Sequence, residues 1–180
     1  MGKNRKDKIE KSVLVKGAVI CIAIAAISFS LIPGLAAQGT GDTVNVTVNV
    51  TVNAQEYVEG TFNASIDVDS VTNFNSGQFD LTFDSSVVNV TDVADGSLDG
   101  ATIPVSDWER MDNDTIRVIL DLSGIASVSG SGNLAKISFA VVGRTGDKSV
   151  LDISNGLLVN TEAEAMLAEW IDDEVIVGPQ

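Results

Sequence analysis

The stretch that decides the fold is Gly77-Gln-Phe-Asp-Leu-Thr-Phe-Asp84, which continues as Ser-Ser-Val-Val-Asn-Val-Thr-Asp-Val93 and reaches a glycine at Gly96. In the first run apolar residues alternate with polar ones, which is the period-two pattern of a strand with one buried face. The polar residues after it interrupt the pattern, and a second alternating run follows. We therefore expect a strand, a corner and a second strand, which a turn at Asp95-Gly96 closes.

The same alternation continues downstream, over 115–122 and again over 132–142 after a loop at 123–131. The inner positions of these two runs are taken by Ile116, Val118, Leu120 and Leu122, and by Ile137, Phe139 and Val141. The pair Asn155-Gly156, between two short apolar runs, favours the positive φ angles of a tight turn. Residues 175–177 form a last short strand, so the sequence predicts an all-β domain.

Four of these segments, taken in order, resemble successive strands of a cohesin domain. They are Gln78-Phe-Asp-Leu-Thr-Phe-Asp-Ser-Ser-Val-Val-Asn-Val90, Val93-Ala-Asp-Gly96, Gly130-Ser-Gly-Asn-Leu-Ala-Lys-Ile-Ser-Phe139 and Ile171-Asp-Asp-Glu-Val-Ile-Val177. The resemblance extends over residues 57–178. It departs from the family at Ser85, where cohesins often have proline, and at the acidic stretch 161–169, which does not align.

The resemblance implies a nine-stranded β-sandwich with jelly-roll topology, the fold that cellulose-binding modules share. It also implies a binding function, because cohesins hold a dockerin module of another protein through one flat sheet face. Dockerins carry duplicated calcium-binding loops, so calcium is expected on the partner and no cofactor on this chain. The outward positions that match this face are Gln78, Asp80, Thr82, Arg117, Ile119 and Asp121. Ile119 is the apolar member of a face that is otherwise polar.

The N-terminus has the pattern of an export signal. Six of the eleven Lys and Arg precede an uncharged apolar run over 17–32, and small residues follow up to Ala37. Cleavage after Ala36 or Ala37 would make this a signal peptide, whereas a retained hydrophobic helix would anchor the protein in the membrane. Both alternatives place the domain in the extracellular space or on the cell surface. We divide the chain into this segment (1–37), a linker or first strand (38–55) and the sandwich (56–180).

Five Asn-X-Ser/Thr sequons could accept N-linked sugar: Asn45, Asn49, Asn63, Asn89 and Asn113. With 12 asparagines and 29 serines or threonines among 180 residues, chance would give about two such sequons. The first two lie in Thr43 to Asn53, an uncharged alternation of valine with Asn and Thr. That segment is either a first strand or an exposed stalk, which sugar would protect from β-aggregation.

Composition excludes several kinds of chemistry. The chain has no histidine, so Ser-His-Asp and Cys-His catalysis and histidine metal sites are excluded. Its one cysteine, Cys21, lies in the apolar run, so no disulfide can form within the domain. Beyond residue 37 the chain has five basic and 23 acidic residues, a net charge near −18, which disfavours nucleic acid as a partner.

The acidic residues themselves suggest neither an enzyme nor a metal site. Carboxylate pairs for glycoside hydrolysis are available only at turn and outward positions, where solvated acid is ordinary. Calcium needs several oxygen ligands from one loop, and neither acidic cluster has that spacing. The clusters are Asp92, Asp95 and Asp99, and Asp172, Asp173 and Glu174.

Two other functions stay open beside the dockerin receptor. A carbohydrate-binding module acting in polysaccharide breakdown would need a row of aromatics for stacking on sugar rings. The domain offers Trp108, Trp170 and Tyr57, and we expect both tryptophans in the core. The other alternative is a glycosylated structural protein of the cell surface, and fold alone cannot choose among the three.

Overall fold

The computed structural model describes residues 47–122 and 127–179, which belong to one compact unit. Within these residues it has eleven strands and no helix. The strands are β1 (Val48–Asn53), β2 (Tyr57–Val58), β3 (Thr61–Thr82), β4 (Val88–Leu98), β5 (Ala101–Ile103), β6 (Val105–Arg110), β7 (Thr115–Asp121), β8 (Val128–Val141), β9 (Lys148–Asn160), β10 (Ala168–Ile171) and β11 (Asp173–Val177). The predicted all-β class is confirmed.

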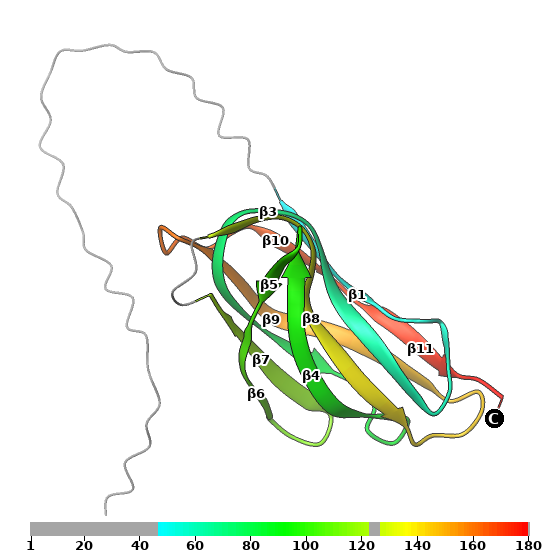
Figure 1. Ribbon diagram of the computed structural model, residues 1–180. Helices are drawn as coiled ribbons and strands as arrows, with labels where there is room; N and C mark the ends of the chain where they lie inside the picture. Colours follow the sequence, from blue (N-terminus) through cyan, green and yellow to red (C-terminus); the bar gives the residue numbers. More distant parts are fainter. Residues whose placement is uncertain (1–46, 123–126, 180) are drawn as a thin grey trace, which may run out of the picture. The chain divides into compact units, whose positions relative to one another are not determined.

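The strands form two layers that share the long strand β3 (Figure 1). Its first half pairs with β1 and β8, and its second half, from Ser76 to Thr82, pairs with β7 and β9. Register shifts near Val71 and Phe74 mark the bend between the halves, as expected for a strand that passes from one sheet to the other. The first layer has the order β10-β1-β3-β8-β4-β5, and the second has β6-β7-β3-β9-β11-β2.

The core lies between the inner faces of the two layers, as the alternation predicts. Phe79, Leu81 and Phe83 are buried, and so are the three inner residues of β7 and Leu122, which follows it. The Phe139 ring stacks on Phe62 with centroids 5.1 Å apart and meets the edge of Phe83 at 5.7 Å. Each fully buried side chain of this size stabilises the fold by roughly 1.5 to 3 kcal/mol, and such burial holds the two layers together.

The uncharged Val/Asn/Thr segment enters the sandwich as β1. Val48, Val50 and Val52 are buried, and the strand pairs antiparallel with β3 and parallel with β10. Over 48–53 the segment is therefore a strand of the first layer. Asn45 lies outside the described residues.

The turn predicted at Asp95-Gly96 is wrong. Strand β4 continues to Leu98, and the chain turns at Asp99-Gly100, where φ is 45° and 86°. Gly96 is buried inside the strand, where a Cβ would collide with the backbone of Asn133 and Leu134. The glycine there permits β4 and β8 to approach closely, which its sequence context does not distinguish from a turn.

The turn predicted at Asn155-Gly156 is also wrong, because β9 runs through it without a break. Asn155 does have a positive φ, 49°. The pairing of β9 with β3 shifts by one residue there, so the pair forms a β-bulge. Gly156 lies against the indole ring of Trp170, where a Cβ would have no room.

At Ser85, where the family often has proline, the backbone N–H makes a hydrogen bond. It donates to Asp114 Oδ1 at 3.1 Å, a bond that proline cannot make. The hydrogen bonds from Ser85 hold the pKa of Asp114 below its usual value. The corner after β3 is thus joined to the turn between β6 and β7.

Other details of the expected fold differ or lie outside the described residues. Eleven strands replace the expected nine, and two of them, β2 and β5, have only two and three residues. The loop expected over 123–131 is shorter, because β8 begins at Val128. The N-terminal hydrophobic helix falls in residues that the structure does not describe. In the part it does describe, no helix has the length and apolarity to cross a membrane.

Candidate functional site

The outer face of the second layer brings together all six residues predicted to contact a partner. We call it the four-strand face: the outward side of β6, β7, the second half of β3, and β9. Residues directly opposite each other on neighbouring antiparallel strands share a face, so the pairing registers define its rows. Three rows form the middle of this face: Asp107, Ile119, Gln78 and Leu157; Glu109, Arg117, Asp80 and Ser154; and Thr115, Thr82 and Asp152. The sixth predicted residue, Asp121, lies opposite Ser76 in the row beyond Ile119.

An ion pair occupies the middle of this face. Arg117 Nε donates to Asp80 Oδ1 and Arg117 Nη2 to Asp80 Oδ2, both at 2.7 Å, which is the two-pronged geometry of a strong pair. The Asn155 side chain donates to Asp80 Oδ2 at 2.9 Å. The Arg117 hydrogen bonds hold the pKa of Asp80 below its usual value, although burial opposes them.

This network changes the role expected of Asp80. The residue is outward in register but only 5% exposed, because Arg117 and Asn155 cover its carboxylate. The Arg117 side chain remains 31% exposed. The pair therefore holds a partly exposed guanidinium in a fixed position on this face, with Asp80 as the residue that positions it.

Two exposed apolar side chains flank Gln78 in the first row. Ile119 is 37% exposed and Leu157, across Gln78 on β9, is 41% exposed. The sequence analysis missed Leu157, because a turn at Asn155-Gly156 would have removed it from this face. The bulge instead resets the alternation, so that an apolar residue after it points outward.

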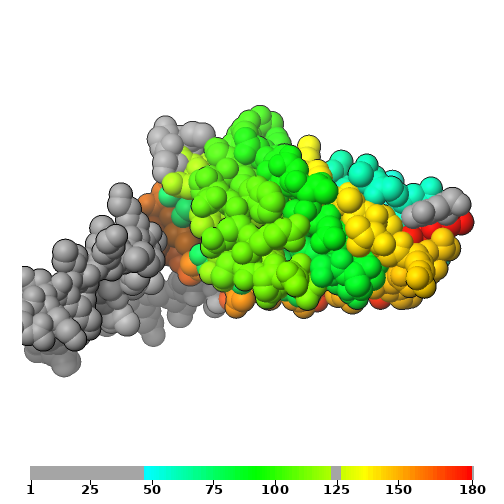
Figure 2. Space-filling view, turned by 90° about the horizontal axis from the view of Figure 1, so that it is seen from below, coloured from blue at the N-terminus to red at the C-terminus, as the bar shows by residue number. Residues whose placement is uncertain are grey.

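Acidic residues surround this centre. Asp107, Glu109 and Asp152 are exposed, whereas Arg117 is the one basic residue in the three rows. Thr82 and Thr115 bond to each other through their hydroxyls at 3.1 Å. Viewed from below, the green residues, which include β6 and β7 of this face and also β4 and β5 of the first layer, form one broad surface without a deep cleft (Figure 2). The four-strand face combines a small apolar centre, one fixed cation and an acidic margin.

The two tryptophans are not part of this face. Trp108 pairs with the buried Val118 and packs against the core, as predicted. Trp170 also packs against the core, over Gly156. Neither is available for a row of sugar-stacking aromatics, so the carbohydrate-binding alternative is not favoured.

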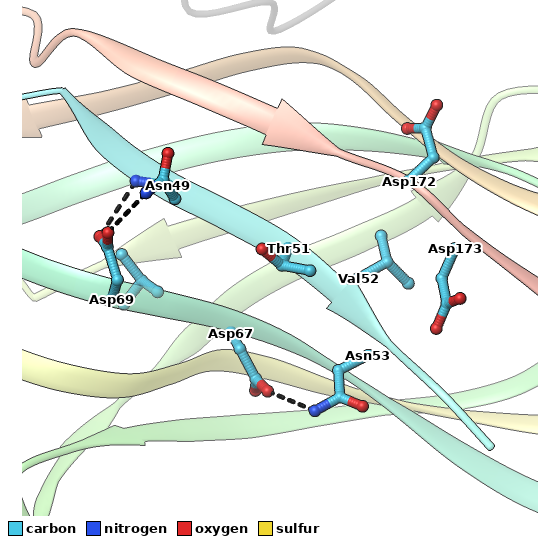
Figure 3. Close-up of a pocket in the computed structure, with 9 residues that line it drawn as sticks. Asn49, Thr51, Val52, Asn53, Asp67, Asp69, Asp172 and Asp173 are labelled. Carbon is cyan, nitrogen blue, oxygen red and sulfur yellow. Dashed lines mark hydrogen bonds between the residues drawn. The ribbon is translucent and has the colours of Figure 1, made fainter.

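A shallow hollow of about 470 Å³ lies beside β1 and the first half of β3 (Figure 3). Two of its carboxylates accept from side-chain amides: Asn49 Nδ2 donates to Asp69 at 2.7 Å and Asn53 Nδ2 to Asp67 at 2.8 Å. The other two, Asp172 and Asp173, accept from backbone N–H groups. Across residues 47–122 and 127–179, no group of three or more acidic, histidine or cysteine side chains is placed to hold a metal ion. The hollow is a hydrogen-bonded acidic surface of the first layer.

Comparison with known families identifies the class of protein. The sequence profile described as "Cohesin domain" matches residues 46–176, which is more than two thirds of the chain. The chain therefore belongs to the cohesin family, as the resemblance indicated. The match begins before β1, in agreement with the place of that strand in the sandwich. A search of the curated proteins finds no match.

Solved structures share the fold at low sequence identity. A non-cellulosomal cohesin from the archaeon Archaeoglobus fulgidus is 18% identical, with a TM-score of 0.62 over 75% of this chain and 94% of its own. The OlpC cohesin of Clostridium thermocellum, solved in a type I cohesin-dockerin complex, is 19% identical, with a TM-score of 0.63 over 78% and 99%. A cohesin module from a family 33 glycoside hydrolase of Clostridium perfringens is 13% identical, with a TM-score of 0.64 over 74% and 98%.

Proposed function

We propose that this chain is a receptor module that binds the dockerin of another protein through the four-strand face, and that it is not an enzyme. The observation that carries the proposal is the pair Ile119 and Leu157, which are exposed on either side of Gln78. Exposed apolar residues gathered at the centre of a polar face are what a protein partner buries best. Membership of the cohesin family and neighbours solved with dockerins support the choice of partner.

We further propose that the module acts outside the cytoplasm. The support is the basic stretch followed by the apolar run over 17–32. Whether this segment is cleaved or kept as an anchor decides whether the bound dockerin protein is released or held at the cell surface. Attachment of another protein in trans is the proposed role in both cases.

A calcium-dependent pull-down tests the proposal directly. The bait is the chain from Gln38 to Gln180, presented to the secreted and surface proteins of the same cells. We expect recovery of proteins with duplicated calcium-binding loops, and their release by a chelator, because the calcium belongs to the dockerin. A bait carrying Ile119→Asp and Leu157→Asp should recover much less.

Two outcomes contradict the proposal. If the chelator releases no dockerin-like protein from the bait, the receptor function is contradicted. Equal recovery by the double variant leaves the receptor function but moves the contact to another surface of the domain.

A further inference from the structure

The four sequon asparagines in the described residues are not distributed evenly over the sandwich. Asn49, Asn63 and Asn89 lie in β1, β3 and β4, and they point outward from the first layer. Asn113 lies in the exposed turn between β6 and β7. No sequon asparagine among the described residues lies in the three rows of the four-strand face.

The side-chain amides of these asparagines differ in their hydrogen bonds and in their exposure. Asn63 is exposed, and its Oδ1 accepts from Ser138 Oγ at 2.9 Å, a bond that does not use the amide nitrogen. Asn113 is also exposed and its side chain makes no hydrogen bond within the described residues. By contrast, Asn49 Nδ2 donates to Asp69 Oδ2 at 2.7 Å, and Asn89 is half-buried.

We propose that Asn63 and Asn113 carry N-linked oligosaccharides and that the apolar centre of the four-strand face, at Ile119 and Leu157, stays free of sugar. The acceptor atom of such a linkage is the amide nitrogen, which both residues leave accessible. The sequon Ser65 lies two residues after Asn63 on the same strand, so both side chains project from the same face. Thr115 similarly follows Asn113, at the start of β7.

The chemistry requires a donor that this chain does not supply, an oligosaccharide joined through its anomeric carbon to a lipid phosphate. The amide nitrogen forms a bond to that carbon and loses a proton. The bond from the anomeric carbon to the phosphate oxygen breaks, and the lipid phosphate leaves. Such donors work outside the cytoplasm, so this inference rests on the export part of the proposed function.

The distribution is consistent with the proposed binding mode. A glycan on Asn63, on the outer side of the first layer, projects away from the second layer, whose outer side is the four-strand face. A glycan on Asn113 would lie in the turn between β6 and β7, at the end of that face next to Thr115, which is two rows from Ile119. The apolar centre of that face therefore remains open to a protein partner. Sugar on Asn63 would instead cover the polar surface of β3 and β8.

Mass spectrometry of the protein isolated from its own cells tests the inference. We expect the peptides containing Asn63 and Asn113 to carry a glycan mass, and the Asn49 peptide to be bare. Ser65→Ala should remove the mass from Asn63, whereas Ser65→Thr, which keeps the sequon, should retain it. Asn113→Gln should remove the second glycan, and Asn49→Gln should leave the glycan masses of the protein unchanged.

The outcomes separate this inference from the proposed function. Unmodified Asn63 and Asn113 peptides overturn it, even if dockerin binding is intact. A glycan on Asn49 with Asn63 bare also overturns it, because accessibility of the amide would then not select the site. Glycosylation at the expected sites without dockerin recovery supports this inference and leaves only the receptor function refuted.

Discussion

At the scale of single residues, the four-strand face depends on a buried carboxylate that holds a cation in position. Asp80 accepts two hydrogen bonds from Arg117 and one from Asn155. Asp80 lies on β3, Arg117 on β7 and Asn155 on β9, so the network also joins these three strands. Its loss should be seen in stability as well as in binding.

Asp80→Asn should lower the free energy of unfolding by roughly 1 to 3 kcal/mol at neutral pH. The folded state lowers the pKa of Asp80, so its contribution is complete above about pH 4. It is lost as the pH falls through the still lower pKa of the folded state. Urea denaturation at about pH 7 and pH 3 should therefore show a difference between variant and parent that narrows in acid.

The control for this prediction is Asp107→Asn, an exposed change on the same face. Surface changes of this kind usually stay within about 0.5 kcal/mol. If Asp80→Asn lowers the free energy of unfolding by the same amount at both pH values, loss of the ion pair is not the cause of the destabilisation.

Ile119→Asp and Leu157→Asp should each weaken dockerin binding by on the order of 2 kcal/mol, or roughly 30-fold in Kd. Each places a charge in the apolar centre of the face without disturbing the core. The matched control is Leu167→Asp, since Leu167 is exposed to 52% beside β10 in the first layer. Calorimetric titration with the recovered dockerin measures all three, and an equal loss for Leu167→Asp would contradict the assignment of the face.

Much of this residue-level arrangement follows from the sequence. Strict alternation in 78–83 and 116–122 predicts the inward set, and all of its members are buried. The outward set shares one face by register, although Asp80 is covered there. The Asp80 network is not predictable in this way, because Asn155 reaches it from a strand that is distant in sequence. Leu157 was missed because its orientation depends on the bulge in β9, which local alternation does not predict.

At the scale of elements, the two misread glycines have a common physical cause. A glycine after Asp or Asn favours a turn, but it also permits close approach of another part of the chain. Gly96 faces the backbone of β8 and Gly156 faces the ring of Trp170. Only the tertiary neighbour distinguishes the two uses, and the sequence alone does not reveal that neighbour.

Gly156→Ala should destabilise the domain by roughly 1 to 3 kcal/mol, the usual range for an overpacked core. The added methyl would occupy the position of the Trp170 indole, so the ring or the bulge has to move. Thermal unfolding measures the loss, and tryptophan fluorescence should report a more exposed indole. Gly178→Ala is the control, because its Cβ would meet only the flexible Glu59 side chain.

For Gly156→Ala the contrary outcome is specific. An unfolding temperature and an emission maximum equal to those of the parent would mean that Trp170 is not packed on Gly156. The bulge would then lack the support that holds Asn155 against Asp80.

At the scale of the whole molecule, the expected domain boundary at residue 56 would leave β1 outside the sandwich. Removing residues up to 55 deletes the buried side chains of Val48, Val50 and Val52. Their burial stabilises the folded state by about 5 to 9 kcal/mol. The deletion also removes the strand with which β10 pairs. That loss approaches the total stability of an ordinary domain, which is about 5 to 15 kcal/mol.

We therefore expect the chain 56–180 to be unfolded and the chain 38–180 to unfold cooperatively on heating. Circular dichroism during a temperature scan compares the two. A cooperative transition of 56–180 at the temperature of the longer chain would contradict the contribution of β1.

The sequence predicts the sandwich and the family, but not how the layers are connected. Local alternation cannot show that β3 passes from one layer to the other, because both halves alternate in the same way. Nor does it show that β1 lies beside β10, since strand pairing over such a sequence distance depends on the closure of the whole fold.

The parallel pairing of β1 with β10 also has a consequence for synthesis. The first strand of the domain to leave the ribosome has to wait for a partner that is made almost last. During that interval an uncharged, valine-rich segment has only the antiparallel edge of β3 to protect it from other nascent chains. A chain that ends before β10 would keep this edge of β1 unpaired, so the first layer is complete only when the last strands have been made.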